Sequence, residues 1–428
     1  MIAADDPARV AAQAAALVNA GDVEAGVEIL DRAVRATDRP DPVLATNLAR
    51  LIWPTGAVER AATLLEDAAT AAPGKVAIWV NLGDVRSALD DPHAESAYRR
   101  ALCLAPAVPE IHWSLATDLL VRGQADRAWP HYHWRHRDPR VRQRPTPFPR
   151  LVSIDRLPPR VLVWSNEGVG EDLRYAGLLP VLAAAGTSIL FETDPRLVPL
   201  FRRSFPSITV VGRAWPPASP AADRTIDAHA SLGDLWPLLA GAAPPPVARG
   251  YLRADPAAVA ALRARYRALG EGPVVGLSWM SRRTPFARSK SVDLAALAPL
   301  LARPAVFVAL QYGDDGGDGE PKGLYRDRAI DPLVDLDGFA AQVAAMDLVV
   351  TSSSTTAHMA GALDVPAWVM VHRGPPITPY WQAGRPEVDW YPRMRVRRQA
   401  EPGHWTDVVA GFVDEFDAWL AGRRPPMP

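Results

Sequence analysis

The chain has 428 residues, of which 48% are hydrophobic and 22% charged; this is the composition of a globular protein with room for two or three domains. Its 47 basic and 48 acidic residues leave a formal net charge of -1, so no basic excess favours nucleic acid as the main partner. The single cysteine, Cys103, excludes a disulfide framework and a cysteine metal site within the chain. The N-terminus lacks the basic region of a signal peptide, and no window of about 18 uncharged apolar residues occurs. The sequence therefore predicts a soluble, cytoplasmic protein without a membrane span.

The first 138 residues contain a repeat with a period of about 34. Residues 47–73 align with residues 81–106, and Trp79 and Trp113 hold the same early place in their units. The other matched positions are Leu65 with Tyr98, Ala68 with Ala101, and Pro73 with Pro106. The pattern resembles the tetratricopeptide repeat over four units, the first of which is degenerate. The resemblance implies helical hairpins over residues 1–138 that stack into a solenoid, whose concave face holds a peptide or another protein. A generic alanine-rich helical bundle is the alternative.

An aromatic and arginine-rich stretch follows the repeats and passes into a proline-rich run. It predicts a last helix and then an extended linker over residues 139–159. His131, His133 and His136 suggest a metal site, but their spacings of two and three do not place all three on one helical face. No acid or cysteine joins them in the sequence. A packed aromatic helix end is therefore favoured over a metal site.

From Arg160 onward, short apolar runs alternate with amphipathic helical patterns, which predicts parallel strands buried on both faces. We expect an all-α solenoid followed by an α/β module of two doubly wound domains, over residues 160–250 and 251–400. A C-terminal helix and tail over residues 401–428 is expected to pack back across the cleft between them. Ligands of such folds bind outside the carboxyl ends of the strands. The strands are expected at residues 160–164, 187–193, 207–212, 274–279, 306–312, 347–353 and 366–371.

Two loops at such strand ends carry polar chemistry. In the first, NEGVGEDLRY, Gly168 and Gly170 let the backbone approach a ligand, and Glu171 and Asp172 follow. The alternative is a tight turn whose acids suit the helix dipole. The second, TSSSTTAHMAGALD, has six consecutive hydroxyl residues before a helix that carries His358. Hydroxyls and free amides at a helix start form a cradle for a diphosphate, and an N-cap with spare serines is the alternative.

A third segment, SWMSRRTPFARSK, runs from Ser278 to Lys290 and carries four cations, including Arg282. It would either neutralise a phosphate or lie as a solvated loop. The acids of DLD, Asp335 and Asp337, precede a helix and indicate a helix cap rather than a metal site.

Taken together, the C-terminal 270 or so residues resemble the family-nine, heptosyltransferase-like glycosyltransferases of the two-domain GT-B type. In particular they resemble bacterial proteins in which such a domain is fused to tetratricopeptide repeats. The segments that carry the resemblance are AWPHYHWRHRD, VLVWSNEGVGEDLRYAGLLP, DLVVTSSSTTAHMAGALDVPAWVMV and WYPRMRVRRQ.

The resemblance implies inverting, metal-independent transfer of a sugar from a nucleotide-sugar donor, with a carboxylate as base and no further cofactor. The family has aspartate after Gly-x-Gly where this chain has Glu171, so Glu171 is the expected base and Asp172 the alternative. The family also has Asp-Thr where Ser353 and Ser354 stand. The residues expected on the donor side are Gly168, Gly170, Ser278, Arg282, Lys290, Ser354, Thr355, Thr356 and His358, and those on the acceptor side are Arg174 and Tyr175.

The expected acceptor is a protein hydroxyl recruited by the repeats, since members of the fused group have been linked to glycosylation of bacterial surface proteins such as flagellin. Two alternatives stay open: transfer to a lipopolysaccharide-type saccharide, and a scaffold whose GT-B domain is inactive. The sugar, the nucleotide and the oligomeric state do not follow from the sequence.

Overall fold

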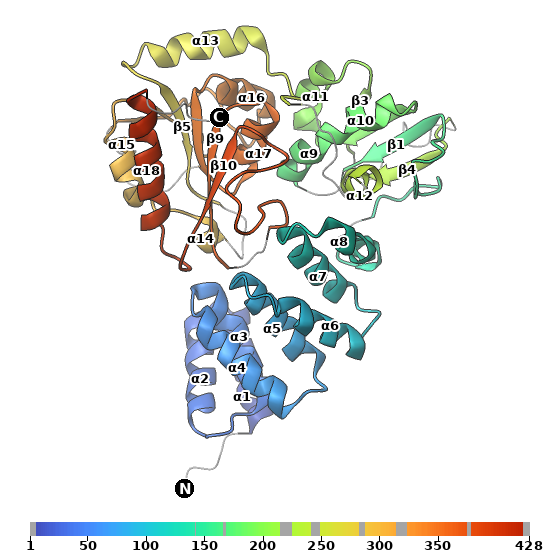
Figure 1. Ribbon diagram of the computed structural model, residues 1–428, viewed down its shortest axis with the longest axis vertical. Helices are drawn as coiled ribbons and strands as arrows, with labels where there is room; N and C mark the ends of the chain where they lie inside the picture. Colours follow the sequence, from blue (N-terminus) through green and yellow to red (C-terminus); the bar gives the residue numbers. More distant parts are fainter. Residues whose placement is uncertain are drawn as a thin grey trace.

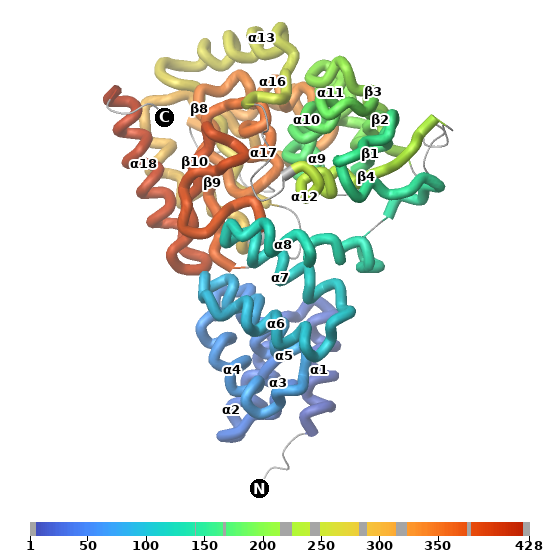
Figure 2. The backbone as a smooth tube through the Cα atoms, turned by 45° about the vertical axis from the view of Figure 1, so that its right-hand side comes forward, coloured from blue at the N-terminus to red at the C-terminus, as the bar shows by residue number. Residues whose placement is uncertain are grey.

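The computed structural model describes residues 6–141, 143–165, 168–214, 225–240, 249–281, 287–313, 323–374 and 378–422. Helices up to residue 137 form one end of the molecule, and two sheet-containing regions lie side by side at the other end (Figure 1). Turning the molecule by 45° leaves the helical part as a separate stack below the sheets (Figure 2). No helix in the described part of the chain is long and apolar enough to cross a membrane.

The N-terminal region consists of helical hairpins that pack on one another in chain order. Its helices are α1 (Pro7–Asn19), α2 (Val23–Arg35), α3 (Pro42–Ile52), α4 (Val58–Ala71), α5 (Val76–Ala88), α6 (Ala94–Leu104), α7 (Pro109–Val121) and α8 (Ala125–Tyr132), with the 3-10 turns η1 (Trp53–Thr55) and η2 (His133–Arg137). The two helices of each hairpin are joined by a residue with positive φ, namely Gly21, Gly56, Asp90 and Gly123. These four turns recur every 33 to 35 residues. The region is therefore a tetratricopeptide-like helical repeat, as expected.

Small residues allow the two helices of a hairpin to approach closely. A Cβ at Gly83 of α5 would lie 2.5 Å from Cε1 of Tyr98 on α6. Tyr98 is fully buried, and its hydroxyl donates a 2.8 Å hydrogen bond to Asp84. The hairpin of α5 and α6 is thus closed by direct contact between Gly83 and the ring of Tyr98.

The first sheet has the strand order β3-β2-β1-β4, and all its pairings are parallel. Val161, Leu162 and Val163 of the central strand β1 are fully buried, as expected for a strand covered on both faces. The elements of this region are β1 (Arg160–Trp164), α9 (Val169–Tyr175), η3 (Ala176–Leu178), α10 (Leu179–Ala184), β2 (Ser188–Thr193), η4 (Pro195–Leu197), α11 (Val198–Ser204), β3 (Thr209–Gly212), β4 (Ala228–Ser231), η6 (Leu232–Asp234) and α12 (Leu235–Ala240).

The second sheet has the order β10-β9-β8-β5-β6-β7 and is also parallel throughout. The prediction of two separate parallel sheets is therefore confirmed. The elements of this region are α13 (Pro256–Arg267), β5 (Val274–Ser278), α14 (Ala287–Lys290), η7 (Leu294–Leu297), α15 (Ala298–Leu301), β6 (Val306–Ala309), β7 (Leu324–Tyr325), α16 (Leu336–Ala344), β8 (Leu348–Ser352), α17 (Thr355–Ala362), β9 (Ala367–Val371), β10 (Met394–Arg398) and α18 (Thr406–Leu420).

The C-terminal helix α18 lies on the second sheet and does not cross to the first, so the expectation for this helix is wrong. Phe412 stacks on Trp368 of β9, with ring centroids 5.2 Å apart. Arg303, which follows α15, forms a 2.8 Å ion pair with Asp417. The apolar face of α18 is therefore buried against the second sheet. The expected cap role of Asp335 is confirmed, because its carboxylate accepts a hydrogen bond from the Gly338 amide.

The linker is extended and runs along the edge of the first sheet. The Leu151 amide donates a 2.7 Å hydrogen bond to the His229 carbonyl, and the His229 amide donates a 2.9 Å hydrogen bond to the Pro149 carbonyl. Arg144 of the linker forms a 2.9 Å ion pair with Glu192 of β2, and both side chains are buried. These contacts fix the linker to the sheet on which it lies.

Direct contacts also fix the repeats to the second sheet. The guanidinium of Arg373, just after β9, donates hydrogen bonds to the Ala88 and Leu89 carbonyls at the C-terminal end of α5. The Ala383 amide donates a 2.9 Å hydrogen bond to the Val121 carbonyl at the end of α7. The repeats are thus docked through the C-terminal ends of their helices.

Candidate functional site

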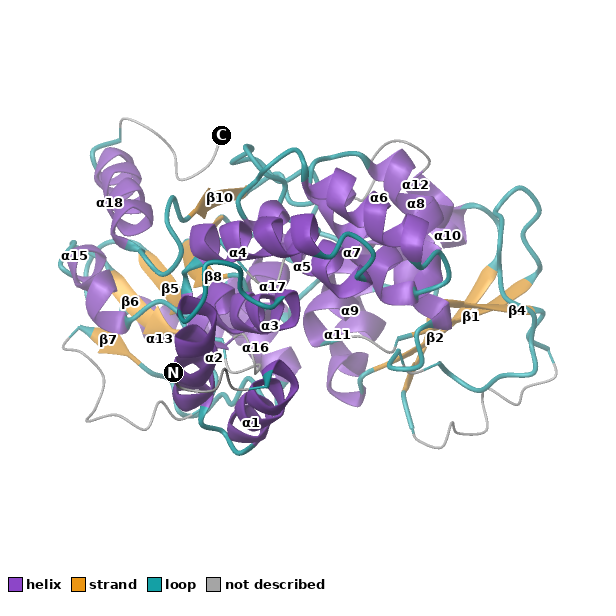
Figure 3. Ribbon diagram, turned by 90° about the horizontal axis from the view of Figure 1, so that it is seen from below, coloured by secondary structure: helices purple, strands orange, loops and turns teal. Residues whose placement is uncertain are grey.

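The two polar loops of the sequence meet where the two sheet regions face each other. Gly168 is the N-cap of α9, which follows β1, and Ser354 is the N-cap of α17, which follows β8. Helices α9 and α17 pack together, and Figure 3 shows them between the two sheets. A Cβ at Gly170 would lie 3.1 Å from Cδ2 of His358 and 3.6 Å from Oγ1 of Thr355. The absence of a side chain at Gly170 therefore allows the two sheet regions to approach closely here.

The two acids of the first loop have different surroundings. Asp172 is 2% exposed, and its carboxylate accepts hydrogen bonds from the hydroxyls of Ser165 and Thr193. It therefore ties α9 to the carboxyl ends of β1 and β2. Glu171 is only partly buried, and its negative charge contributes to raising the pKa of Tyr380, after the larger effect of burial. The charge of Glu171 is therefore close enough to act on Tyr380, in the segment that follows β9.

The N-terminus of α17 has the groups that an anion requires. Ser354 has an extended backbone and makes no side-chain cap; its hydroxyl lies 3.2 Å from that of Thr351. The first amides of an α-helix have no partner within the helix, and its dipole favours a negative charge there. Thr355 is partly exposed and Thr356 is buried in this first turn. Ser353, just before it, accepts a 2.8 Å hydrogen bond from the Trp381 indole.

His358 lies one turn further along α17 and is 3% exposed. Its Nδ1 is 3.2 Å from the Tyr391 hydroxyl, and its ring stacks on Trp381 with centroids 5.6 Å apart. Burial, and then the positive charges of Arg174 and Lys290, lower the pKa of His358 to about 3. His358 is therefore neutral at physiological pH and acts as a hydrogen-bonding group, not as a cation.

Of the remaining residues expected on the donor side, one lies near His358 and another is buried in β5. Lys290, at the end of α14, is close enough for its charge to act on His358. Ser278 is fully buried in β5, and its hydroxyl lies 3.4 Å from the side-chain oxygen of Gln311. It therefore faces the interior of the second sheet region. Arg282 lies outside the described residues.

Arg174 and Tyr175, expected on the acceptor side, lie in an aromatic cluster. Arg174 is 3% exposed, and four rings surround its guanidinium at 4.3 to 5.1 Å from their centroids. The rings belong to Tyr175, Trp236, Tyr380 and Trp390. The indole of Trp390 donates a 3.1 Å hydrogen bond to the Arg174 carbonyl. Residues from both sheet regions therefore enclose one arginine.

Apart from Tyr175, the sequence did not identify the aromatic side chains that frame His358 and Arg174. Tyr251 donates a hydrogen bond to the Leu173 or the Arg174 carbonyl at the end of α9, at 2.9 and 3.0 Å. Tyr391 lies over Gly361 of α17, where a Cβ would be 2.4 Å from its ring. The available signal was the density of aromatic residues in YWQAGRPEVDWY, residues 380–391.

His133 and His136 of η2 do acquire an acid in the structure, contrary to the expectation from sequence. Single ligand atoms of His133, His136 and Asp234 lie within 4.8 Å of one another. The same carboxylate, however, accepts hydrogen bonds from Arg135 at 2.8 Å and Arg150 at 3.1 Å. Arg135 and His136 hold the pKa of Asp234 well below its usual range, against the opposing effect of burial. The positive charges of Arg135 and Arg150 already balance this carboxylate and oppose a divalent cation. The geometry favours an ion-pair hub that joins η2 and the linker to the first sheet.

The chain is similar to Protein FlbA of Caulobacter vibrioides, with 30% identity over 371 residues. The match covers 79% of this chain, and the chain spans 60% of the length of that relative. No family model matches the sequence.

The chain is also similar to solved structures of MamA. One MamA structure is 24% identical, with 31% of this chain and 77% of that chain covered and a TM-score of 0.28. The R50E mutant of MamA is 27% identical, with 30% and 94% covered and a TM-score of 0.22. These scores are too low to establish a shared fold.

Proposed function

We propose that this chain is a glycosyltransferase that moves a sugar from a nucleotide-sugar donor to a hydroxyl group of a protein acceptor. One observation carries the proposal: the starts of α9 and α17, at the carboxyl ends of two separate parallel sheets, pack against each other through Gly170 and His358. Twin parallel sheets bind ligands at their carboxyl ends. This position therefore suits a donor held by one region and an acceptor held by the other, as in the GT-B glycosyltransferases that the sequence resembles.

In the proposed reaction, Glu171 takes the proton of the acceptor hydroxyl as its oxygen attacks the anomeric carbon. Asp172 is already engaged by Ser165 and Thr193, which favours Glu171 as the base. The amides at the start of α17 and the ammonium of Lys290 stabilise the departing diphosphate. Neutral His358 contributes a hydrogen bond. These groups supply the stabilisation without requiring a metal, which accords with the resemblance.

The repeats are proposed to hold the acceptor protein. They are docked on the second sheet region by Arg373 and Ala383, so an acceptor bound to them would keep a fixed position relative to α17. A fixed position lowers the entropic cost of bringing a hydroxyl group to the reacting carbon.

The proposal is tested by measuring the melting temperature of the full chain with a panel of nucleotides and nucleotide sugars. A donor that binds only the folded state raises the melting temperature once its concentration exceeds its Kd. We expect one nucleotide class to do so, and Lys290→Ala to weaken the effect. Lys75→Ala, which changes an exposed lysine on the repeats, is the matched control.

Transfer itself is then followed by the intact mass of trial acceptors, purified flagellin among them, with and without EDTA. A mass increase of one sugar that persists in EDTA is the expected result. If no nucleotide changes the melting temperature of the well-folded protein, the transferase proposal is wrong, and a repeat scaffold with an inactive α/β region becomes the better account.

A further inference from the structure

A cavity of about 280 Å³ lies at the junction of the repeats with both sheet regions. The repeats contribute Leu120, Arg122 and Ala125 to its lining, and the first sheet region contributes Arg174 and Trp236. The second sheet region contributes several residues of the segment 379–390. Tyr380 lines this cavity and also contacts His358 edge-on, with ring centroids 4.7 Å apart. The cavity is thus next to the candidate active site but has a separate lining, which includes neither Glu171 nor His358.

Two buried donors in the cavity lining lack partners among the described residues: Nε of Arg174 and Nε1 of Trp236. The Arg174 guanidinium carries five donor hydrogens, and it makes one side-chain hydrogen bond, from Nη1 to the Tyr175 hydroxyl at 3.3 Å. A buried arginine normally pairs with a carboxylate. The four surrounding rings offset the positive charge of Arg174, but its Nε donor keeps no hydrogen-bond partner among the described residues.

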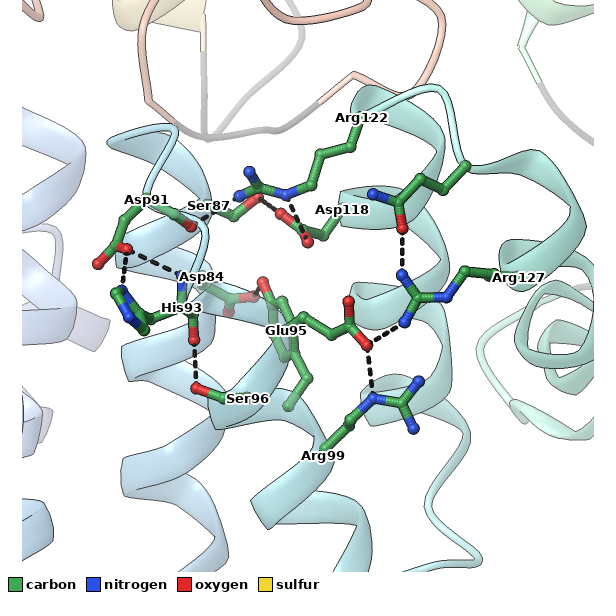
Figure 4. A network of polar contacts seen from close by, with 12 residues as sticks. Asp84, Ser87, Asp91, His93, Glu95, Ser96, Arg99, Asp118, Arg122 and Arg127 are labelled. Carbon is green, nitrogen blue, oxygen red and sulfur yellow. Dashed lines mark hydrogen bonds and ion pairs between the residues drawn. The ribbon is translucent and has the colours of Figure 1, made fainter.

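The other two arginines of the cavity are already engaged by acids. Arg122 donates a 3.0 Å hydrogen bond to Asp118 and a 2.8 Å one to the Asp91 carbonyl (Figure 4). Arg385 pairs with Asp389 at 2.9 Å. Arg122 is thus balanced by Asp118 and Arg385 by Asp389, and the remaining acid of the lining, Glu387, is exposed. The buried Arg174 has no acid partner among the described residues. A ligand with a single negative charge fits this guanidinium better than a dianion, because a second buried charge would have no partner.

We propose that this cavity binds a small molecule through a carboxylate group, which pairs with the Arg174 guanidinium while the body of the ligand packs against Trp236, Tyr380 and Trp390. The site would be complete only when the repeats are docked, because Leu120, Arg122 and Ala125 form one wall. The assignment does not depend on the transferase activity.

The test is a thermal-shift titration of the full chain with sodium acetate, sodium phenylacetate, phenylacetamide and inorganic phosphate, all at matched ionic strength. We expect a saturable rise of about 1–2 °C with a carboxylate, a smaller rise with phosphate and none with the neutral amide. Arg174→Met is expected to abolish the carboxylate effect. Ala125→Phe, which fills the cavity from a partly exposed position on α8 and leaves Arg174 in place, is expected to do the same.

The second variant keeps the test decisive if Arg174→Met does not fold. The proposal is overturned if neither carboxylate raises the melting temperature, if the amide or phosphate acts as strongly as the carboxylates, or if the effect persists in Ala125→Phe. A nucleotide effect that survives in Ala125→Phe would leave the transferase proposal standing and separate the two sites.

Discussion

Gly170 and His358 belong to helices that follow strands of different sheets, yet a Cβ at Gly170 would lie 3.1 Å from Cδ2 of His358. This contact couples the two regions of the candidate active site. We expect Gly170→Val to lower the free energy of unfolding by about 1–3 kcal/mol, because its branches would overlap the imidazole ring.

The matched measurement is a double-mutant cycle with His358→Ala, read by urea unfolding. Removing the ring vacates the space, so the cost of Gly170→Val should be smaller in that background, by about 0.5–3 kcal/mol. Strict additivity of the two substitutions would show that the two helices are not coupled through this contact.

His358 should make stability depend on pH in a defined window. Its folded-state pKa of about 3 lies below the ordinary value of 6.5, so the unfolded chain binds more protons between these pH values. The contribution of His358 is fully present above about pH 6.5 and is lost as pH falls toward 3, at up to about 1.4 kcal/mol per pH unit. His358→Gln should therefore flatten the fall in unfolding free energy between pH 6.5 and 4.5. An unchanged slope in this variant would mean that His358 is not held neutral.

The repeats should be sensitive to a single methyl group at one glycine. A Cβ at Gly83 would lie 2.5 Å from the Tyr98 ring, whereas a Cβ at Gly74 would meet no atom within 4 Å. We expect Gly83→Ala to cost about 1–3 kcal/mol of stability and Gly74→Ala to change it by less than about 0.5 kcal/mol. Equal effects in urea unfolding would contradict the packing of α5 against α6.

Arg373 should determine how firmly the repeats are held. Its side chain donates hydrogen bonds to the carbonyls of Ala88, Leu89 and Ala400. Arg373→Met leaves those acceptors without this donor, which should cost about 1–3 kcal/mol and increase amide hydrogen exchange at the end of α5. Arg32→Met, at a 75% exposed arginine of α2, is the control and should change little. If exchange at α5 is unaffected, the repeats are held by other contacts.

Much of the fold could be predicted, because the deciding signals are local. Strand β1 is a continuous apolar run and is buried throughout its centre. The helical repeats can be recognised in the sequence by their period and by the glycines at their turns. The turn at Asp90 was not predictable, because an aspartate with positive φ of 59° stands where the other hairpins have glycine, and aspartate is only one of several residues that tolerate this conformation.

The sequence indicated which loops form the candidate site, but not the role of each residue in them. Glu171 and Asp172 are adjacent in sequence, and only the fold brings Ser165 and Thr193 to Asp172. The rings around Arg174 come from positions 236, 380 and 390, so no local pattern could indicate them. Asp234 likewise reaches His133 and His136 only through the docking of η2 on the first sheet region.

The proposed division of roles between the two acids is the central claim, and one comparison tests it most directly. Turnover of the nucleotide-sugar donor and nucleotide Kd are measured for wild type, Glu171→Gln and Asp172→Asn. Glu171→Gln should lower kcat about 10²–10⁴-fold with nucleotide Kd nearly unchanged, while Asp172→Asn should mainly lower stability, by about 1–3 kcal/mol. Wild-type turnover that Glu171→Gln retains in full would contradict the account.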